Sequence, residues 1–150
     1  MTSRLEPVIR NRMRGAVIDV GTNSVKLLVA VFSKNKIKPL LEESKQTRLG
    51  RGFYQNHFLQ PSAIEQTAEA VAHFAQTAKK QGVAFIRVIA TSAARDAKNP
   101  EDLICAIEKK SDLRVEIISG EQEADWVFRG VITNPELARH ALLILDVGGG

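Results

Sequence analysis

The chain has 150 residues, of which 44% are hydrophobic and 25% charged, as is usual for one soluble globular domain with its own core. Its formal net charge of +4 favours an anionic partner without identifying one, and its single cysteine, Cys105, excludes an internal disulfide. No segment resembles a signal peptide or is long and apolar enough to span a membrane, so we expect a cytoplasmic protein with no membrane partner.

The first third of the chain reads as a leader followed by three strands. Residues 1–13 are polar, lack periodicity and carry several arginines, which predicts a disordered basic leader. Apolar, β-branched runs at 16–18, 25–32 and 37–43 are spaced like the strands of an antiparallel meander. A loop rich in glycine and arginine follows at 46–52.

Helices and strands alternate after that loop. Ser62 and Glu65 have the spacing of a capping box, and the helix behind it should end at Gly82. A strand at 84–90 leads into a turn or short helix at 91–95. A helix capped by Asn99-Pro100 follows, in which we expect Cys105 to be a buried structural thiol.

The last third contains a strand at 115–118, a helix and a final strand. Ser119 and Gln122 form a second capping box, and Ala124, Val127, Phe128 and Val131 have the spacing of a helix face that packs on the core. Residues 142–147 predict a last strand. Together the elements predict an α/β fold with a mixed five-stranded sheet flanked by helices, whose later strands are added in parallel.

A short internal repeat bears on the domain organisation. Residues 18–21 read Ile-Asp-Val-Gly and residues 145–148 read Leu-Asp-Val-Gly, each after apolar strand residues. We therefore expect one lobe over 14–139 and the start of a truncated second lobe over 140–150, because an unpaired terminal strand would leave an open edge. The alternative is a single domain that pairs the last strand within its own sheet.

Both copies of the repeat have the composition of a phosphate-binding turn. After Asp19, the residues Gly21, Thr22, Asn23 and Ser24 offer backbone N–H groups and side-chain donors to an anion. After Asp146, the run Gly148, Gly149 and Gly150 allows the same close approach. Asp19 and Asp146 would then act as magnesium ligands, Asp19 through water. The alternatives are an ordinary hairpin turn and a flexible linker.

Further candidates come from one acidic and several basic positions. Glu123 lies in the first turn of a helix, where the helix N-terminus keeps a carboxylate ionised and able to accept a proton from water. Arg95 follows Thr91 and Ser92 directly after a strand, where ligands of α/β sheets bind. Arg48 and Arg51 are similar candidates from the glycine-containing loop. The alternatives are routine helix stabilisation and solvated surface charge.

Five segments in this order resemble the exopolyphosphatase and guanosine pentaphosphate phosphohydrolase family. They are Ala16-Val-Ile-Asp-Val-Gly-Thr-Asn-Ser24, Arg48-Leu-Gly-Arg-Gly52, Ala90-Thr-Ser-Ala-Ala-Arg95, Ile117-Ile-Ser-Gly-Glu-Gln-Glu-Ala124 and Leu145-Asp-Val-Gly-Gly-Gly150. The resemblance implies a ribonuclease H-like lobe of the actin and Hsp70 ATPase type, with the active site between two lobes. Gln122 departs from the family pattern, which often has Glu there.

The resemblance also implies roles for individual residues. Glu123 would be the general base, and Gly21, Thr22, Asn23, Ser24, Arg48, Thr91, Ser92, Arg95, Gly148, Gly149 and Gly150 would contact phosphate. Mg²⁺ would be the cofactor, and polyphosphate the substrate. Guanosine pentaphosphate is the alternative substrate, and no nucleic-acid partner is expected.

Two other classes of function stay open at this point, as does a homodimer. One is a kinase or ATPase of the same fold, which would bind ATP tightly and transfer phosphate to an acceptor. The other is a non-catalytic module. We expect residues 1–150 alone to show weak or no turnover, because the second lobe would supply part of the cleft.

Overall fold

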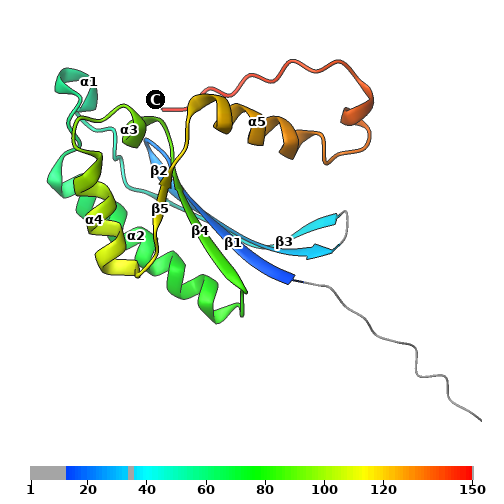
Figure 1. Cartoon of the computed structure of the whole chain (residues 1–150), viewed down its shortest axis with the longest axis horizontal. Coiled ribbons are helices and arrows are strands. Elements are labelled where there is room, and N and C mark those ends of the chain that lie inside the picture. Colours follow the sequence, from blue (N-terminus) through cyan, green and yellow to red (C-terminus); the bar gives the residue numbers. More distant parts are fainter. Residues whose placement is uncertain (1–12, 34–35, 150) are drawn as a thin grey trace, which may run out of the picture.

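A five-stranded sheet forms the centre of the computed structural model, which describes residues 13–33 and 36–149 (Figure 1). Its strands are β1 (Met13–Val20), β2 (Ser24–Ser33), β3 (Lys36–Gln46), β4 (Phe85–Ala90) and β5 (Val115–Ile117). They are arranged in the order β3-β2-β1-β4-β5. The order agrees with an α/β fold that grows outward from its first hairpin.

The directions of the strands match those expected from the sequence. β1 pairs with β2, and β2 with β3, in antiparallel fashion, whereas β4 runs parallel to β1 and β5 parallel to β4. The helical crossovers before β4 and β5 explain this change, since a crossover returns the chain to the same end of the sheet. The carboxyl ends of β1, β4 and β5 therefore lie along one edge.

Five helices connect and flank these strands. Two are long and apolar on one side, α2 (Pro61–Lys80) and α4 (Pro100–Ser111), and two are short, α1 (Phe53–Asn56) and α3 (Ser92–Arg95). The fifth, α5 (Gly120–Val131), follows β5, and a 3₁₀ turn, η1 (Leu137–Arg139), comes after it. Among the described residues no helix is long and apolar enough to cross a membrane.

The core lies between the sheet and the pair α2 and α4, which lie side by side on one face (Figure 1). Because side chains alternate along a strand, Ile18 and Val20 of β1 point to this face, where Val71 of α2 is also fully buried. Asp19, between them, must point to the opposite face. This alternation places a carboxylate beyond the core at the carboxyl end of the central strand.

Two local expectations for the helices are wrong. Helix α2 begins after Gln60, with Pro61 in its first turn and no side-chain cap, because the fixed φ of proline suits that position. Glu65 is thereby free to pair with Lys110 of α4 at 2.7 Å. Cys105 is exposed, since the buried face of α4 is set by Leu103 and Ile107.

The expectation for the C-terminal helix is correct in its cap and wrong in its burial. Ser119 caps α5 by accepting a hydrogen bond from the Gln122 N–H at 3.1 Å. No residue of α5 is buried, and Phe128 is 46% exposed, because the helix lies beyond the end of the sheet rather than over the core. Its apolar stripe therefore faces something other than the core.

Residues 142–147 form no strand in the structure, although the sequence predicts one. The segment runs back from the end of α5 toward α1 (Figure 1), and no described strand pairs with it. Leu143, Leu145 and Val147 are consequently more than 80% exposed. The predicted leader lies outside the described residues except for Met13, which already belongs to β1.

The packing of α4 on α2 gives a first testable prediction. Leu103 is fully buried, so Leu103→Ala should lower the free energy of unfolding by about 2–5 kcal/mol through lost contacts and a residual cavity. Urea unfolding of this variant beside Cys105→Ala, on the exposed side of the same helix, measures the effect. Equal losses in the two variants would contradict the assigned face.

Candidate functional site

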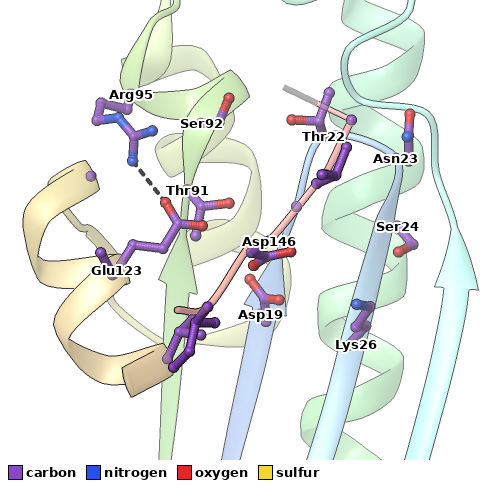
Figure 2. Close-up of a pocket in the computed structure, with 18 of the residues that line it drawn as sticks. Asp19, Thr22, Asn23, Ser24, Lys26, Thr91, Ser92, Arg95, Glu123 and Asp146 are labelled. Atoms are coloured by element: carbon purple, nitrogen blue, oxygen red, sulfur yellow. Dashed lines mark hydrogen bonds and ion pairs between the residues drawn. The ribbon is translucent and has the colours of Figure 1, made fainter. Parts of the chain in front are cut away.

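The candidate site is a cleft of about 990 Å³ at the carboxyl edge of β1, β4 and β5 (Figure 2). It lies where the chain leaves these strands, which is the usual place for ligands in α/β sheets. Residues far apart in sequence converge on it. The polar ones are Asp19, Thr22, Asn23, Ser24, Lys26, Thr91, Ser92, Arg95, Asp96, Glu123 and Asp146, and the glycines are Gly21, Gly120, Gly148 and Gly149.

The turn between β1 and β2 forms one wall of the cleft. It is closed by a hydrogen bond from the Gly21 N–H to the Ser24 carbonyl at 3.0 Å. The next two N–H groups, of Thr22 and Asn23, donate to no group in the described part of the chain. Successive free N–H groups bind anions, so this turn can hold a phosphate oxygen.

A second loop holds this turn in place. The N–H groups of Thr47 and Arg48 both donate to the Asn23 carbonyl, at 3.1 and 2.9 Å, and the Gly50 N–H donates to the Thr22 carbonyl at 2.8 Å. Gly50 also packs tightly, because an added Cβ would lie 2.3 Å from the Thr22 methyl carbon. The loop therefore fixes the position of the turn through backbone contacts.

Asp19 is the least satisfied polar group of the cleft. Its Oδ1 atom is buried and has no hydrogen-bond partner among the described residues. Burial raises the pKa of Asp19 above 3.8, the nearby Lys26 ammonium lowers it, and the carboxylates of Glu123 and Asp146 raise it further. A bound cation would therefore stabilise the ionised Asp19, because Lys26 only partly offsets the effect of burial and of the other carboxylates.

Glu123 and Arg95 contact each other on the wall of the cleft opposite the β1–β2 turn. Arg95 Nη1 donates to Glu123 Oε2 at 3.1 Å (Figure 2). The same nitrogen donates to the Ile118 carbonyl at 3.1 Å. The arginine is thus anchored to the end of β5 and holds the carboxylate at the cleft. No described residue donates to Glu123 Oε1, so this oxygen can accept a proton from a water molecule.

The extended segment after η1 lies over the cleft. Asp146 contributes its carboxylate beside Asp19 (Figure 2), and the Gly149 carbonyl accepts a hydrogen bond from the Tyr54 hydroxyl at 2.9 Å. Gly149 packs on the Asn23 side chain of the β1–β2 turn, because an added Cβ would lie 2.1 Å from the Asn23 side-chain nitrogen Nδ2. A larger residue at position 149 would therefore require this side chain to move.

The carboxylates offer a partial site for a divalent cation. No group of three His, Cys, Asp or Glu side chains able to chelate a metal occurs within residues 13–33 and 36–149. Magnesium, however, keeps several waters and is commonly held by one or two carboxylates together with substrate phosphates. The orphaned Asp19 oxygen and the adjacent Asp146 fit that pattern.

Most of the residues expected from the sequence meet in this cleft, and three do not. Arg48 and Arg51 lie outside it, and Arg48 is linked to the site only through its backbone N–H. Gly150 lies outside the described residues. Sequence reasoning missed Lys26, which pairs with Asp19 in the β1–β2 register. The period of two that places Ser24 and Lys26 on one face was the available signal.

The apolar residues of α5 were also misassigned from the sequence. Ala124, Val127 and Phe128 line the cleft instead of packing on the core. Helical periodicity identifies a buried stripe but does not say what covers it. Here the stripe faces the cleft, which Leu142 and Ile144 of the segment after η1 also line.

A family comparison agrees with this geometry. The family model described as the Ppx/GppA phosphatase family matches residues 24–150. The chain belongs to the Ppx/GppA phosphatase family. Among curated relatives, Exopolyphosphatase 2 of Mycobacterium tuberculosis is 32% identical over 91% of this chain and 46% of its own length. The bifunctional 3-dehydroquinate synthase/phosphatase of Fusobacterium nucleatum is 31% identical over 94% and 22%.

Solved structures show the same fold. The Ppx/GppA family member of Aquifex aeolicus matches with a TM-score of 0.77 and 30% identity, over 83% of this chain and 41% of that chain. An exopolyphosphatase from Cytophaga hutchinsonii matches with a TM-score of 0.75 and 31% identity, over 79% and 38%. The chain thus spans less than half the length of these relatives.

The contact between the two loops gives a prediction that a second substitution can reverse. Gly50→Ala should lower the free energy of unfolding by about 1–3 kcal/mol, because the new methyl group overlaps the Thr22 methyl carbon. Thr22→Ser removes that carbon and keeps the hydroxyl, so the double variant should regain most of the loss. Additive effects in this double-mutant cycle would contradict the contact.

Proposed function

We propose that this protein is an exopolyphosphatase-type phosphohydrolase that releases terminal phosphate from inorganic polyphosphate with the help of Mg²⁺. One observation supports this most strongly. One cleft is lined by the N–H groups of Thr22 and Asn23 and by Asp19 Oδ1, none of which has a partner among the described residues, and by the Arg95-bound Glu123. Relatives of this chain named exopolyphosphatases add support.

The residues of the cleft divide the work of phosphoryl transfer. The Thr22–Ser24 turn would bind the terminal phosphate, and Thr91, Ser92 and the Nη2 group of Arg95 would contact the phosphate next to it. Such reactions depend on positioning and charge neutralisation more than on covalent chemistry. Lys26, whose ammonium lies near Asp19, would add positive charge on the same wall.

Glu123 would accept the proton of the attacking water. Its carboxylate is held by Arg95, which orients it and leaves its second oxygen toward the cleft. A positioned general base typically contributes about 10²–10⁴-fold to a rate. The three carboxylates near one another would repel a polyanion, so the substrate needs a counter-charge in addition to Lys26 and Arg95.

Asp19 and Asp146 would hold Mg²⁺, Asp19 through water. The ion would supply the missing positive charge between these carboxylates and the phosphate oxygens. The buried Oδ1 of Asp19, without a partner in the described part of the chain, is the feature of this protein that supports the assignment.

Guanosine pentaphosphate is the alternative substrate, and one observation favours it. Val127 and Phe128 form an apolar wall of the cleft, and an exposed aromatic ring can stack on a nucleobase. Phe128→Ala should raise KM for a guanosine substrate and not for polyphosphate if the base lies on this wall. Comparing phosphate release from the two substrates therefore separates the two proposals.

The test of the function is the loss of the base. In the full-length protein, Glu123→Gln keeps an acceptor for Arg95 but removes the proton acceptor, so kcat for long-chain polyphosphate should fall by about 10²–10⁴-fold. Glu121→Gln, two residues away and outside the cleft, is the matched control and should keep the wild-type rate. A normal rate in the Glu123 variant would place the base elsewhere.

Binding of Mg²⁺ has a readout that does not depend on activity. Because the pKa of Asp19 is raised in the folded protein, its ionised form lowers folding stability at a pH above that pKa. Without metal, Asp19→Asn should therefore be at least as stable as the wild type. Mg²⁺ should raise the Tm of the wild type and have a smaller effect on this variant. Equal stabilisation of both proteins would remove Asp19 from the metal site.

A further inference from the structure

A second depression, of about 290 Å³, lies outside the cleft and is lined without any carboxylate. It is formed by the loop after β3 and the start of α2. Its lining residues are Gln46, Thr47, Arg48, Arg51, Ser62, Ala63 and Gln66. Two arginines, two amides and two hydroxyls with no acidic group form a set of donors that suits an oxyanion.

A tight turn keeps the two arginines together. The Arg51 N–H donates to the Arg48 carbonyl at 2.9 Å, and such a turn holds the two Cα atoms within about 7 Å. Arg48 adopts φ of 52°, a conformation uncommon for residues other than glycine. In the described part of the chain neither guanidinium forms an ion pair or a side-chain hydrogen bond.

Two further groups at the depression have no hydrogen-bond or charge partner among the described residues: the Thr47 hydroxyl and the N-terminus of α2. Thr47 is 2% exposed, and its hydroxyl has no hydrogen-bond partner among the described residues. The first turn of α2 contains no acidic residue, so the positive end of its dipole is not offset there. Two adjacent cations, a buried hydroxyl and a helix N-terminus thus share one hollow that contains no negative charge of its own.

This depression is linked directly to the phosphate turn of the cleft. Thr47 and Arg48, which line it, donate their N–H groups to the Asn23 carbonyl. An anion bound between Arg48 and Arg51 would therefore order the same loop that positions Thr22 and Asn23. The two sites lie on either side of one loop-to-turn contact.

We propose that this depression is a second anion site, which binds a phosphate group through Arg48 and Arg51. The phosphate is either free orthophosphate or a distal phosphate of the polyanion whose end occupies the cleft. The second source rests on the proposed function, whereas binding of orthophosphate does not.

Titration of the full-length protein with orthophosphate, followed by the backbone amide signals of Arg51 and Gln66, tests the site. Both signals should shift along a saturable curve. In Arg48→Asn/Arg51→Gln the apparent Kd should rise about tenfold or more, because each charge-assisted hydrogen bond is worth about one such factor. Asparagine tolerates the backbone conformation of Arg48. Arg114→Gln, an exposed arginine outside both depressions, should keep the wild-type Kd.

Kinetics distinguish the two sources of phosphate. If the site takes a distal phosphate, the double variant should raise KM for long-chain polyphosphate more than KM for tripolyphosphate. If it takes orthophosphate, the ratio of the two KM values should stay that of the wild type while the amide titration is weakened. Should the protein hydrolyse neither substrate, the proposed function fails and the titration still decides on the site.

The proposal is wrong if the Arg51 and Gln66 signals do not move at phosphate concentrations that saturate the Thr22 and Asn23 signals. It is also wrong if they move equally in the double variant. The single variant Arg51→Gln serves if the double variant fails to fold. Its Tm and the amide signals of α4, compared with those of the wild type, show whether it is folded. In that single variant a wild-type Kd would overturn the paired-arginine site.

Discussion

The parallel pairing of β1 with β4 is the constraint on which the site depends. It sets Val20 beside Ala90, and the Thr91 N–H extends the ladder by donating to the Val20 carbonyl at 3.3 Å. The phosphate turn and the Thr91–Arg95 segment must then leave the sheet next to each other. Since β5 adds to β4 in the same direction, Glu123 is delivered to the same edge by the first turn of α5.

The electrostatics of this edge support the proposal that it binds phosphate and a divalent cation together. Asp19 is half-buried on the face of the sheet away from α2 and α4, close to Asp146 and Glu123. This arrangement costs folding free energy at Asp19, because burial and the neighbouring carboxylates both raise the pKa of Asp19. In the proposed function a cation and a polyanion would offset this cost by entering together, as in metal-assisted phosphoryl transfer.

The turn between β1 and β2 is held rigid by the loop after β3, for which the sequence predicts a loop but not this role. The Thr47–Gly50 loop fixes the carbonyl groups of Thr22 and Asn23, and thereby the orientation of their free N–H groups. Backbone donors that are already oriented lose little entropy on binding, so they bind an oxyanion more strongly than mobile ones. The same loop carries Arg48 and Arg51, which connects the cleft to the second depression.

Local patterns predicted the parts of the fold that depend on local forces. The meander, the direction of β4 and β5, and the Ser119 cap follow from alternation, crossover handedness and side-chain hydrogen bonding. The errors concern what packs on an element. Neither the exposure of Cys105 nor the position of Phe128 at the cleft can be read from periodicity, which gives a face but not its neighbour. Residues 142–147 have strand composition but no described partner.

Site residues that lie together in one motif could be predicted from the sequence. Site residues brought together only by the pairing register of two strands could not be predicted as easily. The composition of residues 19–24 indicates a phosphate-binding turn without further information. Lys26, in contrast, joins the site only because it pairs with Asp19 in the neighbouring strand. Arg48 shows the reverse case, since its sequence context suggests phosphate contact in the cleft while the turn at 48–51 directs it elsewhere.

The central claim is that the Thr22–Ser24 turn, Asp19 and Glu123 surround one terminal phosphate. A crystal structure of the full-length protein with Mg²⁺ and a non-hydrolysable polyphosphate analogue tests it most directly. The terminal phosphate should lie within hydrogen-bond distance of the Thr22 and Asn23 N–H groups, with a water between it and Glu123. An analogue bound away from this turn, or a Glu123 carboxylate turned from the phosphate, would contradict it.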